Sequence, residues 1–294
     1  MKSNNKRKLK KADFIILGLA AVLVIYIVYR IKVTIRYEWA WEILPKYIFR
    51  FDDKLGRWVS AAIFSGFIMT IKLSIWGIIL GTAIGIVMGI LRVHTELFGR
   101  VISRVYVDLI RNIPPLVLVF IFYFFFSSQI LDNLGLEELV KASGPVIQSI
   151  LTVIFIKPSL FNEFLSAVLS IALYEGAYIT EIVRAGIESI PKGQWEAGHA
   201  IGLSRYRQFR HIILPQALRN VLPPLSGQFI STIKDSAIVS VISVPELSFQ
   251  GMQVMASTYA SFETWIVITG LYFILTFSCA AFFGRLLQRL KAAD

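Results

Sequence analysis

Five charged residues stand inside otherwise apolar segments of the sequence: Lys72, Glu175, Glu181, Lys234 and Asp235. Ionised side chains are costly in hydrocarbon, so they usually face the interior of a helix bundle or a water-filled path. A carboxylate near a cation matches the two charges of a zwitterionic solute. Glu175, near the middle of its segment, is the best lone carboxylate. Lys234 and Asp235 are adjacent, so neutralising other interior groups explains them equally well.

The sequence offers little for other kinds of chemistry. It has three histidines and one cysteine, Cys279, which lies inside an apolar run. A disulfide, a thiolate metal cluster and a metal site of several histidines are therefore not expected. No G-x4-GK[ST] motif occurs, so the chain lacks a P-loop for ATP phosphates. We predict no catalytic residues, no metal and no bound cofactor.

Composition assigns the chain to the membrane. Apolar residues make up 56% of the 294 residues, and the mean hydropathy is +0.66. Several apolar runs approach the roughly 20 residues that a helix needs to cross the hydrocarbon core. The net charge of +11 comes mostly from short segments beside these runs, which is typical of membrane topology and lipid headgroups rather than nucleic acid.

Six segments are long and apolar enough to be predicted as spanning helices, so we expect an all-α membrane protein. A further run, VIQSILTVIFI, is too short to span and is predicted as a re-entrant or interfacial helix on the outer side. The six segments are residues 14–29, 66–91, 113–128, 164–183, 221–244 and 265–284.

The distribution of basic residues predicts the orientation. The basic N-terminus, residues 92–112, residues 184–220 and the C-terminal tail carry most of the excess and should lie in the cytoplasm. Glu181 and Arg184 then lie near the cytoplasmic end of their segment, where they could hold the geometry of a gate. Residues 30–58 are an exception, because seven basic residues against four acids fall on the outer side.

Small residues predict where two helices pack closely. Gly77, Gly81, Gly85 and Gly89 recur at a spacing of four and form one stripe along a helix face. Small residues let helix backbones approach each other in lipid. The stripe should pack against another helix of the same subunit or, as the second alternative, form a seam between two subunits.

The segment 194–215, QWEAGHAIGLSRYRQFRHIILP, is unusually polar for this chain and lies in the longest predicted cytoplasmic loop. Aromatic and arginine side chains alternate in it at helical spacing, which indicates an amphipathic element. From composition alone, a docking surface for a partner and a basic helix lying on anionic lipid are equally plausible.

The order of residues in this loop distinguishes the two interpretations. It resembles the loop motif EAA-x3-G-x9-I-x-LP of bacterial ABC importer permeases. Gly198 replaces the second alanine of the motif, and the other positions match. The matching positions here are Glu196, Ala197, Gly198, Gly202, Ile212, Leu214 and Pro215.

Flanking segments extend the resemblance to the polar amino acid branch of these permeases, which transports histidine, glutamine, glutamate, arginine and related substrates. AYITEIVRAGIESIPKGQWEAG, LPQALRNVLPPL and FISTIKDSAIVSVISVPEL look like this branch, as do RNIPPLVLVFIFYF and TIKLSIWGIILGTAIGIVMGILR. The match covers roughly residues 60–290. Two positions depart from the branch: Ser236-Ala237-Ile238 replaces a usual Thr-Ser-Leu, and Glu175 stands where small or neutral residues are common.

The resemblance implies a fold and a set of partners. It implies a type I (MetI-like) importer domain of five helices with the coupling loop at about 188–215, preceded in residues 1–59 by an extra helix and an external linker. It also implies separate ATPase subunits that bind ATP and grip the loop, an external (periplasmic or extracellular) amino-acid-binding protein, and a second copy or homologue of the permease. The chain would be a multi-pass protein of a bacterial inner membrane.

Within this implied mechanism, Glu196 is the candidate for the charged contact with the ATPase, Gly202 should end the loop helix, and Pro215 should begin the return to the membrane. A permease for another small polar solute is the main alternative. A secondary transporter or channel would use the same intramembrane charges but has no need of this loop, and a membrane enzyme lacks candidate catalytic groups.

Overall fold

The computed structural model describes residues 11–34, 37–54, 56–93 and 96–292. The chain forms two compact units, Met1–Ala40 and Trp41–Asp294. The first contains helix α1 (Lys11–Thr34), whose apolar stretch Ala12–Ile27 is shorter than a typical span. The basic residues predicted to keep the N-terminus in the cytoplasm lie mostly in 1–10, outside the described residues.

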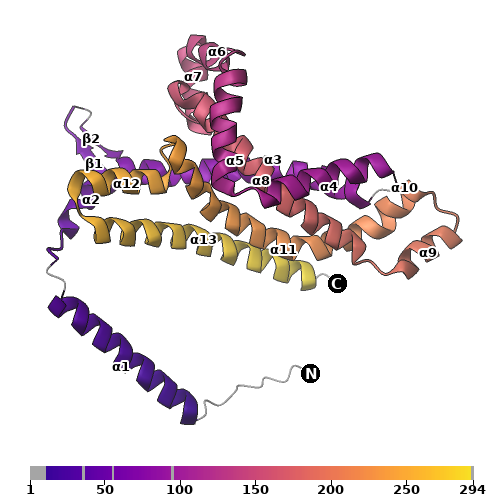
Figure 1. The fold of residues 1–294 in the computed structure, drawn as a ribbon, viewed down its shortest axis with the longest axis horizontal. Helices are drawn as coiled ribbons and strands as arrows, with labels where there is room; N and C mark the ends of the chain where they lie inside the picture. The colour runs from indigo at the N-terminus through magenta and orange to yellow at the C-terminus, as the bar shows by residue number, and fades with distance from the viewer. Residues whose placement is uncertain (1–10, 35–36, 55, 94–95, 293–294) are drawn as a thin grey trace. The chain divides into compact units, whose positions relative to one another are not determined.

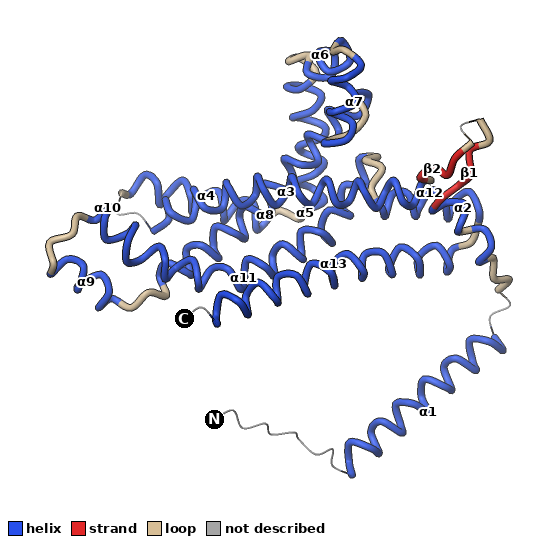
Figure 2. Tube along the Cα trace, turned by 180° about the vertical axis from the view of Figure 1, so that it is seen from behind, coloured by secondary structure: helices blue, strands red, loops and turns tan. Residues whose placement is uncertain are grey.

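The second unit is a bundle of helices with one small β-hairpin, so the expected all-α membrane class is confirmed (Figures 1 and 2). Before the first long helix come η1 (Trp41–Ile43), α2 (Pro45–Ile48), β1 (Phe49–Asp52) and β2 (Arg57–Ser60). The rest of the bundle consists of α3 (Ala62–Val93), α4 (Leu97–Asn112), α5 (Pro115–Ile121), η2 (Phe122–Leu131), α6 (Leu136–Ala142), α7 (Pro145–Ile154), η3 (Pro158–Leu160), α8 (Phe161–Glu188), α9 (Lys192–Ala200), α10 (Arg205–Gln208), η4 (Phe209–Ile213), α11 (Leu214–Asp235), η5 (Ser236–Ile242), α12 (Leu247–Thr258) and α13 (Ser261–Ala292).

Three helical segments among the described residues are long and apolar enough to cross a membrane: Ala62–Val93, Pro158–Glu188 and Ser261–Arg289. A bent pair, Leu97–Asn112 with Pro115–Leu131, makes a fourth if it is one broken span; the chain bends by 108° between the two helices. The predicted total of six spans therefore stays a prediction.

Two predicted spans differ from the structure in their form. Residues 113–128 were expected to be one helix, but α5 passes at Phe122 into a π-helix, η2. Residues 221–244 were also expected to continue as one helix, but α11 ends at Asp235 and a 3-10 helix follows to Ile242. Apolar composition marks both stretches as helical and does not distinguish the hydrogen-bonding pattern.

The glycine stripe lies against α8. A Cβ atom added to Gly77 would lie 2.6 Å from Ile171 Cγ2, and one added to Gly89 would lie 2.6 Å from Val183 Cγ1. Residue numbers rise together along the two helices, so α3 and α8 run parallel. This packing within one chain is the first of the two alternatives that the spacing left open.

We expect Gly85→Ala to lower the stability of the protein, because the new Cβ would lie 2.4 Å from Ile179 Cγ2 and 3.2 Å from the carbonyl oxygen of Gly176. Overpacking of this kind costs about 1–3 kcal/mol. Thermal unfolding in detergent, followed by gel filtration, measures the effect. Gly270→Ala is the matched control, because nothing lies within 4 Å of its added Cβ. Equal unfolding temperatures for the two variants would contradict the expectation.

The hairpin and α12 lie at the end of the bundle opposite α9 and α10 (Figure 1). Glu246 caps α12 there, because its carboxylate accepts hydrogen bonds from the backbone N–H groups of Ser248 and Phe249 at 2.9 and 2.7 Å. Tyr272 of α13 donates to the same carboxylate at 2.8 Å, and Thr70 Oγ1 of α3 accepts from the N–H of Leu247 at 3.1 Å. These bonds join three helices at this end.

The short apolar run predicted as re-entrant or interfacial forms α7, whose C-terminal end contacts α3. Lys72 Nζ donates to the Thr152 carbonyl at 2.7 Å, and the rings of Trp76 and Phe155 stack at 4.9 Å. A cation at a helix C-terminus satisfies carbonyls that lack helical partners. Lys72, one of the five charges in apolar segments, therefore holds α7 in place.

Candidate functional site

A pocket in the middle of the bundle brings together the three residues predicted to line a solute path. Its volume is about 170 Å³. Glu175 comes from α8, whereas Lys234 and Asp235 come from the last turn of α11. The remaining lining residues are Pro115, Leu118 and Val119 of α5, Ser170, Ile171 and Tyr174 of α8, and Ile238 of η5.

Glu175 is the buried charge of this pocket. Its side chain is fully buried, and Oε2 accepts a hydrogen bond from Gln228 Nε2 at 2.6 Å. Oε1 is also buried and has no donor at normal hydrogen-bond geometry among the described residues, although Thr232 and Asp235 lie beside the carboxylate. A buried carboxylate oxygen without a donor has the capacity to accept one from a bound cation. Nothing in the sequence pattern identified Gln228, which orients this carboxylate.

Lys234 and Asp235 differ from Glu175 in their exposure. Both are exposed, although they line the same pocket. They place one cation and one more carboxylate at the pocket wall, with the carboxylate of Asp235 next to that of Glu175. The site therefore presents both charges that a zwitterionic solute requires, and side chains of α5, α8 and η5 form the rest of the wall.

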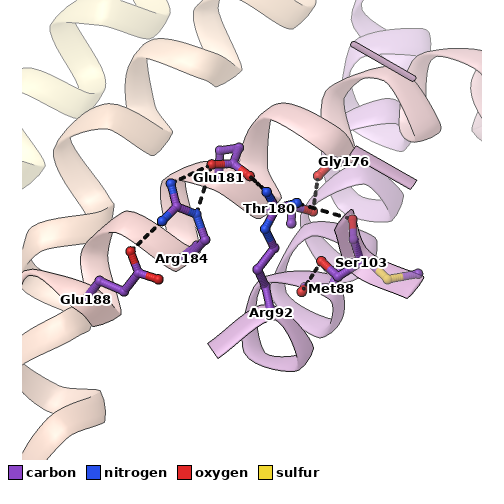
Figure 3. A network of polar contacts seen from close by, with 8 residues as sticks. All are labelled: Met88, Arg92, Ser103, Gly176, Thr180, Glu181, Arg184 and Glu188. Carbon is purple, nitrogen blue, oxygen red and sulfur yellow. Dashed lines mark hydrogen bonds and ion pairs between the residues drawn. The ribbon is translucent and has the colours of Figure 1, made fainter. Parts of the chain in front are cut away.

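Glu181 and Arg184 belong to an ion-pair cluster nearer the α9 end of α8, and the cluster also contains Arg92 (Figure 3). Arg184 Nε and Nη2 donate to Glu181 Oε2 at 2.9 and 2.8 Å, and Arg184 also pairs with Glu188. Arg92 Nη2 of α3 lies 3.2 Å from Glu181 Oε1. Figure 3 shows Glu181 between the two arginines, so its carboxylate joins α3 to α8.

Arg92 was missed as a site residue, although the sequence placed it in the basic group at the cytoplasmic end of α3. Its Nη1 also donates to the Ser103 carbonyl of α4 at 3.4 Å, and Ser103 Oγ donates to the Met88 carbonyl at 2.8 Å. One arginine therefore links three helices, α3, α4 and α8. Basic residues at the end of a span indicate only which side of the membrane that end faces. The ion-pair partner of Arg92 depends on how α3 packs against α8, which the sequence of this segment does not show.

We expect Arg92→Ala and Glu181→Ala to be non-additive in a double-mutant cycle of thermal stability, with a coupling energy of about 0.5–3 kcal/mol. The two side chains are 17% and 20% exposed, so solvent screens the pair incompletely. Arg104→Ala combined with Glu181→Ala is the control, because Arg104 is an exposed residue of α4. Additive effects in the Arg92 cycle would show that the contact contributes nothing.

The polar loop folds as α9 followed, after a tight turn, by α10. Gly202 has a φ of +74°, and its N–H donates to the His199 carbonyl at 3.0 Å. The Leu203 N–H donates to the Gly198 carbonyl at 3.1 Å. This pair of bonds is the Schellman motif, which favours glycine because φ is positive. Gly202 thus ends α9, in the position that the sequence predicted for it.

Gly198, the departure from the loop motif, is the buried residue of α9. A Cβ added to it would lie 2.9 Å from Gln208 Cγ and 3.0 Å from Ile212 Cδ1. Gln208 crosses this space, and its Nε2 donates to the Trp195 carbonyl. The missing methyl group leaves room for a hydrogen bond that joins the two arms of the loop.

The last three motif residues lie where the loop enters α11. Ile212 belongs to the π-helix η4, and Leu214 and Pro215 begin α11. Proline has no N–H for the helix ladder, and the wider π-turn directly before it fits that loss. Pro215 stands in the first turn of α11, and the chain is helical without a break from Arg205 through Asp235.

Glu196 and Ala197 lie on the exposed surface of α9, and Glu196 borders a wide groove of about 1120 Å³. The groove lies between the loop and the ends of α3 and α8, and includes Ile90, Ile187 and Phe209. Tyr206 and Ile201 are 69% and 72% exposed beside it. An acidic residue, an aromatic ring and an aliphatic side chain are thus all exposed on this loop.

Metal binding finds no support in the part of the chain that the structure describes. No group of three or more His, Cys, Asp or Glu side chains in those residues is arranged to hold a metal ion.

The whole arrangement matches a known family. Residues 81–292 match the model of the binding-protein-dependent transport system inner membrane component. The chain belongs to this family. As an inner membrane component of such a system, it is a multi-pass membrane protein and a permease subunit.

Curated relatives of this inner membrane component are permeases of amino acid transport systems. The glutamine transport system permease protein GlnP of Escherichia coli K12 is 35% identical over 225 residues, which cover 75% of this chain and 90% of the relative. The arginine ABC transporter permease protein ArtQ of Haemophilus influenzae is 33% identical over 225 residues, covering 76% and 88%.

Solved structures agree on the fold of this inner membrane component. A crystal structure of an amino acid ABC transporter with histidines superposes with a TM-score of 0.62 at 29% identity and covers 78% of this chain and 94% of that chain. The MetNI methionine ABC transporter in an inward-facing conformation gives a TM-score of 0.54 at 18% identity, with the same coverage. The expectation of a MetI-like fold is thereby confirmed.

Proposed function

We propose that the chain is the permease subunit of an ATP-driven importer that moves a polar amino acid across the cytoplasmic membrane. The observation that supports this most directly is the pocket of Glu175, Lys234 and Asp235. Its carboxylate and cation match the ammonium and carboxylate groups of an amino acid. Relatives named for glutamine and arginine transport support the same substrate class.

The proposed partners follow from the same family. An ATPase subunit would bind the exposed surface of α9 around Glu196 and would carry the P-loop that this sequence lacks. An external binding protein would deliver the substrate at the opposite end of the bundle. A second permease, either a copy or a homologue, would complete the pathway. ATP would then be bound and hydrolysed by the ATPase subunit and not by this chain.

The loop geometry suits transmission of force from the ATPase. The Schellman turn at Gly202 and the Gln208 bond to Trp195 fix α9 relative to α10. Closure of the ATPase would then move the loop as a body, and the continuous helix from Arg205 to Asp235 would carry that movement towards the pocket.

Uptake into proteoliposomes tests this function. The permease, reconstituted with its ATPase subunit and external binding protein, should accumulate a labelled polar amino acid with ATP inside and external binding protein outside. Uptake that continues without ATP and follows an ion gradient would identify a secondary transporter. A panel of other small polar solutes distinguishes the alternative of an ABC permease for a different substrate.

A further inference from the structure

The excess of basic residues between the first two predicted spans is unexplained by the transport mechanism. Residues 30–58 hold seven basic residues against four acids on the predicted outer side. Four of the seven are exposed in or beside the β-hairpin that precedes α3: Lys46, Arg50, Lys54 and Arg57. The hairpin also lies outside the family match, which begins at residue 81.

The hairpin has an aromatic face. In its antiparallel register Phe51 pairs with Trp58, and the two rings meet edge to face at 5.8 Å. Phe49, two residues before Phe51, shares the face because side chains alternate along a strand. Phe51 is 50% exposed and Trp58 is 69% exposed. Rings this exposed are typical of a surface that contacts something other than water.

The opposite face is polar. Arg50 pairs with Val59, and Arg57 pairs with Asp52, so both arginines lie on the face away from the rings. Lys54 is exposed at the turn. The face with the arginines also carries Asp52 and Val59, so the hairpin has an aromatic side and an opposite side on which two arginines stand with one carboxylate.

The aromatic face continues the exposed apolar surface of a spanning helix. The ring of Phe49 lies 4.7 Å from that of Phe64 in the first turn of α3. Ile68 lies four residues after Phe64, and Ile75 lies seven residues after Ile68, so all three share one helix face. Ile68 is 37% exposed and Ile75 is 50% exposed. This face differs from the glycine stripe that packs on α8. The hairpin directly precedes α3 in the chain and extends this face beyond the first turn of the helix.

We propose that the hairpin is an anchor in the outer headgroup layer of the membrane, with Phe49, Phe51 and Trp58 turned towards the lipid chains and Arg50 and Arg57 bound to lipid phosphates. Aromatic residues are enriched at this level of membrane proteins because their rings are amphipathic. Arginine matches phosphate oxygens in charge and in geometry. The basic excess on the outer side is then a lipid contact. This proposal does not depend on the transported solute.

Tryptophan quenching tests the position of Trp58 in the full-length protein reconstituted in vesicles. The fluorescence lost on substitution in Trp58→Phe is the contribution of Trp58, called here the Trp58 share. Lipids brominated on their upper acyl chains should quench this fluorescence. Iodide dissolved in the water should not. Trp265→Phe, at the outer start of α13, is the reference for a tryptophan at the membrane surface. Trp195→Phe, in the loop helix α9, is the reference for a partly buried tryptophan at the other end of the bundle. Quenching of the Trp58 share by iodide and not by brominated lipid would overturn the proposal.

A second arm tests the lipid phosphates. Brominated phosphatidylglycerol should quench the Trp58 share more strongly than brominated phosphatidylcholine, and the preference should fall about fivefold for each arginine removed in Arg50→Gln and Arg57→Gln. Lys141→Gln, on α6, is the control for a general change in charge and should keep the preference. The fluorescence of the Trp58 share could instead be unquenched by either lipid and change in intensity when the external binding protein is added. The hairpin would then be a protein-docking site, and the lipid proposal would be wrong.

Discussion

Replacing Glu175 with Gln should weaken amino acid transport about ten- to hundredfold in half-saturation concentration. The substitution keeps the shape of the side chain and removes the charge that we propose binds the ammonium group. A hydrogen bond to a charged group contributes about 1.5–3 kcal/mol, which corresponds to this range. The loss should be greatest for a cationic substrate, if that is the natural one.

The measurement is concentration-dependent uptake in proteoliposomes for neutral, acidic and basic amino acids. Glu163→Gln is the matched control, because it makes the same change on the same helix at a position that does not line the pocket. Gln228→Ala removes the donor to Glu175 Oε2 and keeps the charge, so its effect should be smaller. If Glu175→Gln leaves the half-saturation concentration unchanged for neutral, acidic and basic amino acids, Glu175 does not bind the substrate and its role is structural.

Reversing the charge in Glu196→Lys should abolish uptake without affecting insertion. Glu196 is exposed on α9, so the folded permease loses no internal contact, whereas a proposed contact with the ATPase becomes repulsive. Loss of a charge pair at an interface costs about 2 kcal/mol or more, or roughly a thirtyfold loss of affinity. Co-purification with the ATPase subunit measures binding directly, and the amount in the membrane fraction measures insertion.

The control for this reversal is Asp108→Lys, which makes the same change at an exposed position of α4. It should bind the ATPase and transport normally. Normal uptake and wild-type co-purification of Glu196→Lys would show that the docking contact lies elsewhere on the loop, for instance at the exposed Tyr206 and Ile201.

The sequence predicted those parts of the site that depend on local pattern. Gly202 could be assigned to a helix end because a positive φ favours glycine. The charges at 175, 234 and 235 could be assigned to the bundle because lipid excludes them; they line one pocket, in which Glu175 is buried and Lys234 and Asp235 are exposed, and their role stays a prediction. Both inferences use physics that acts on a single residue or a single helix.

The remaining features depend on contacts between helices. Arg92 pairs with Glu181 because α3 and α8 run parallel and the glycines of α3 let the two helices approach closely. Nothing in the basic segment 92–112 specifies Glu181 as the partner. Gln208 joins α9 to α10 through the space beside Gly198, which the motif alone shows only as a small residue. The end of α11 at Asp235 was missed because the apolar residues after it suit either kind of helix.

Helix α11 has its first turn at the coupling loop and its last turn at the pocket, and Pro223 and Pro224 stand between them. Each proline removes one N–H from the backbone ladder, so two consecutive rungs are absent at mid-length. The helix bends most easily at that point, so a push on the loop end would reach the pocket end together with a change of angle between the two halves of α11. The half of α11 that carries Lys234 and Asp235 would then tilt about the proline pair, which would move these two side chains relative to Glu175.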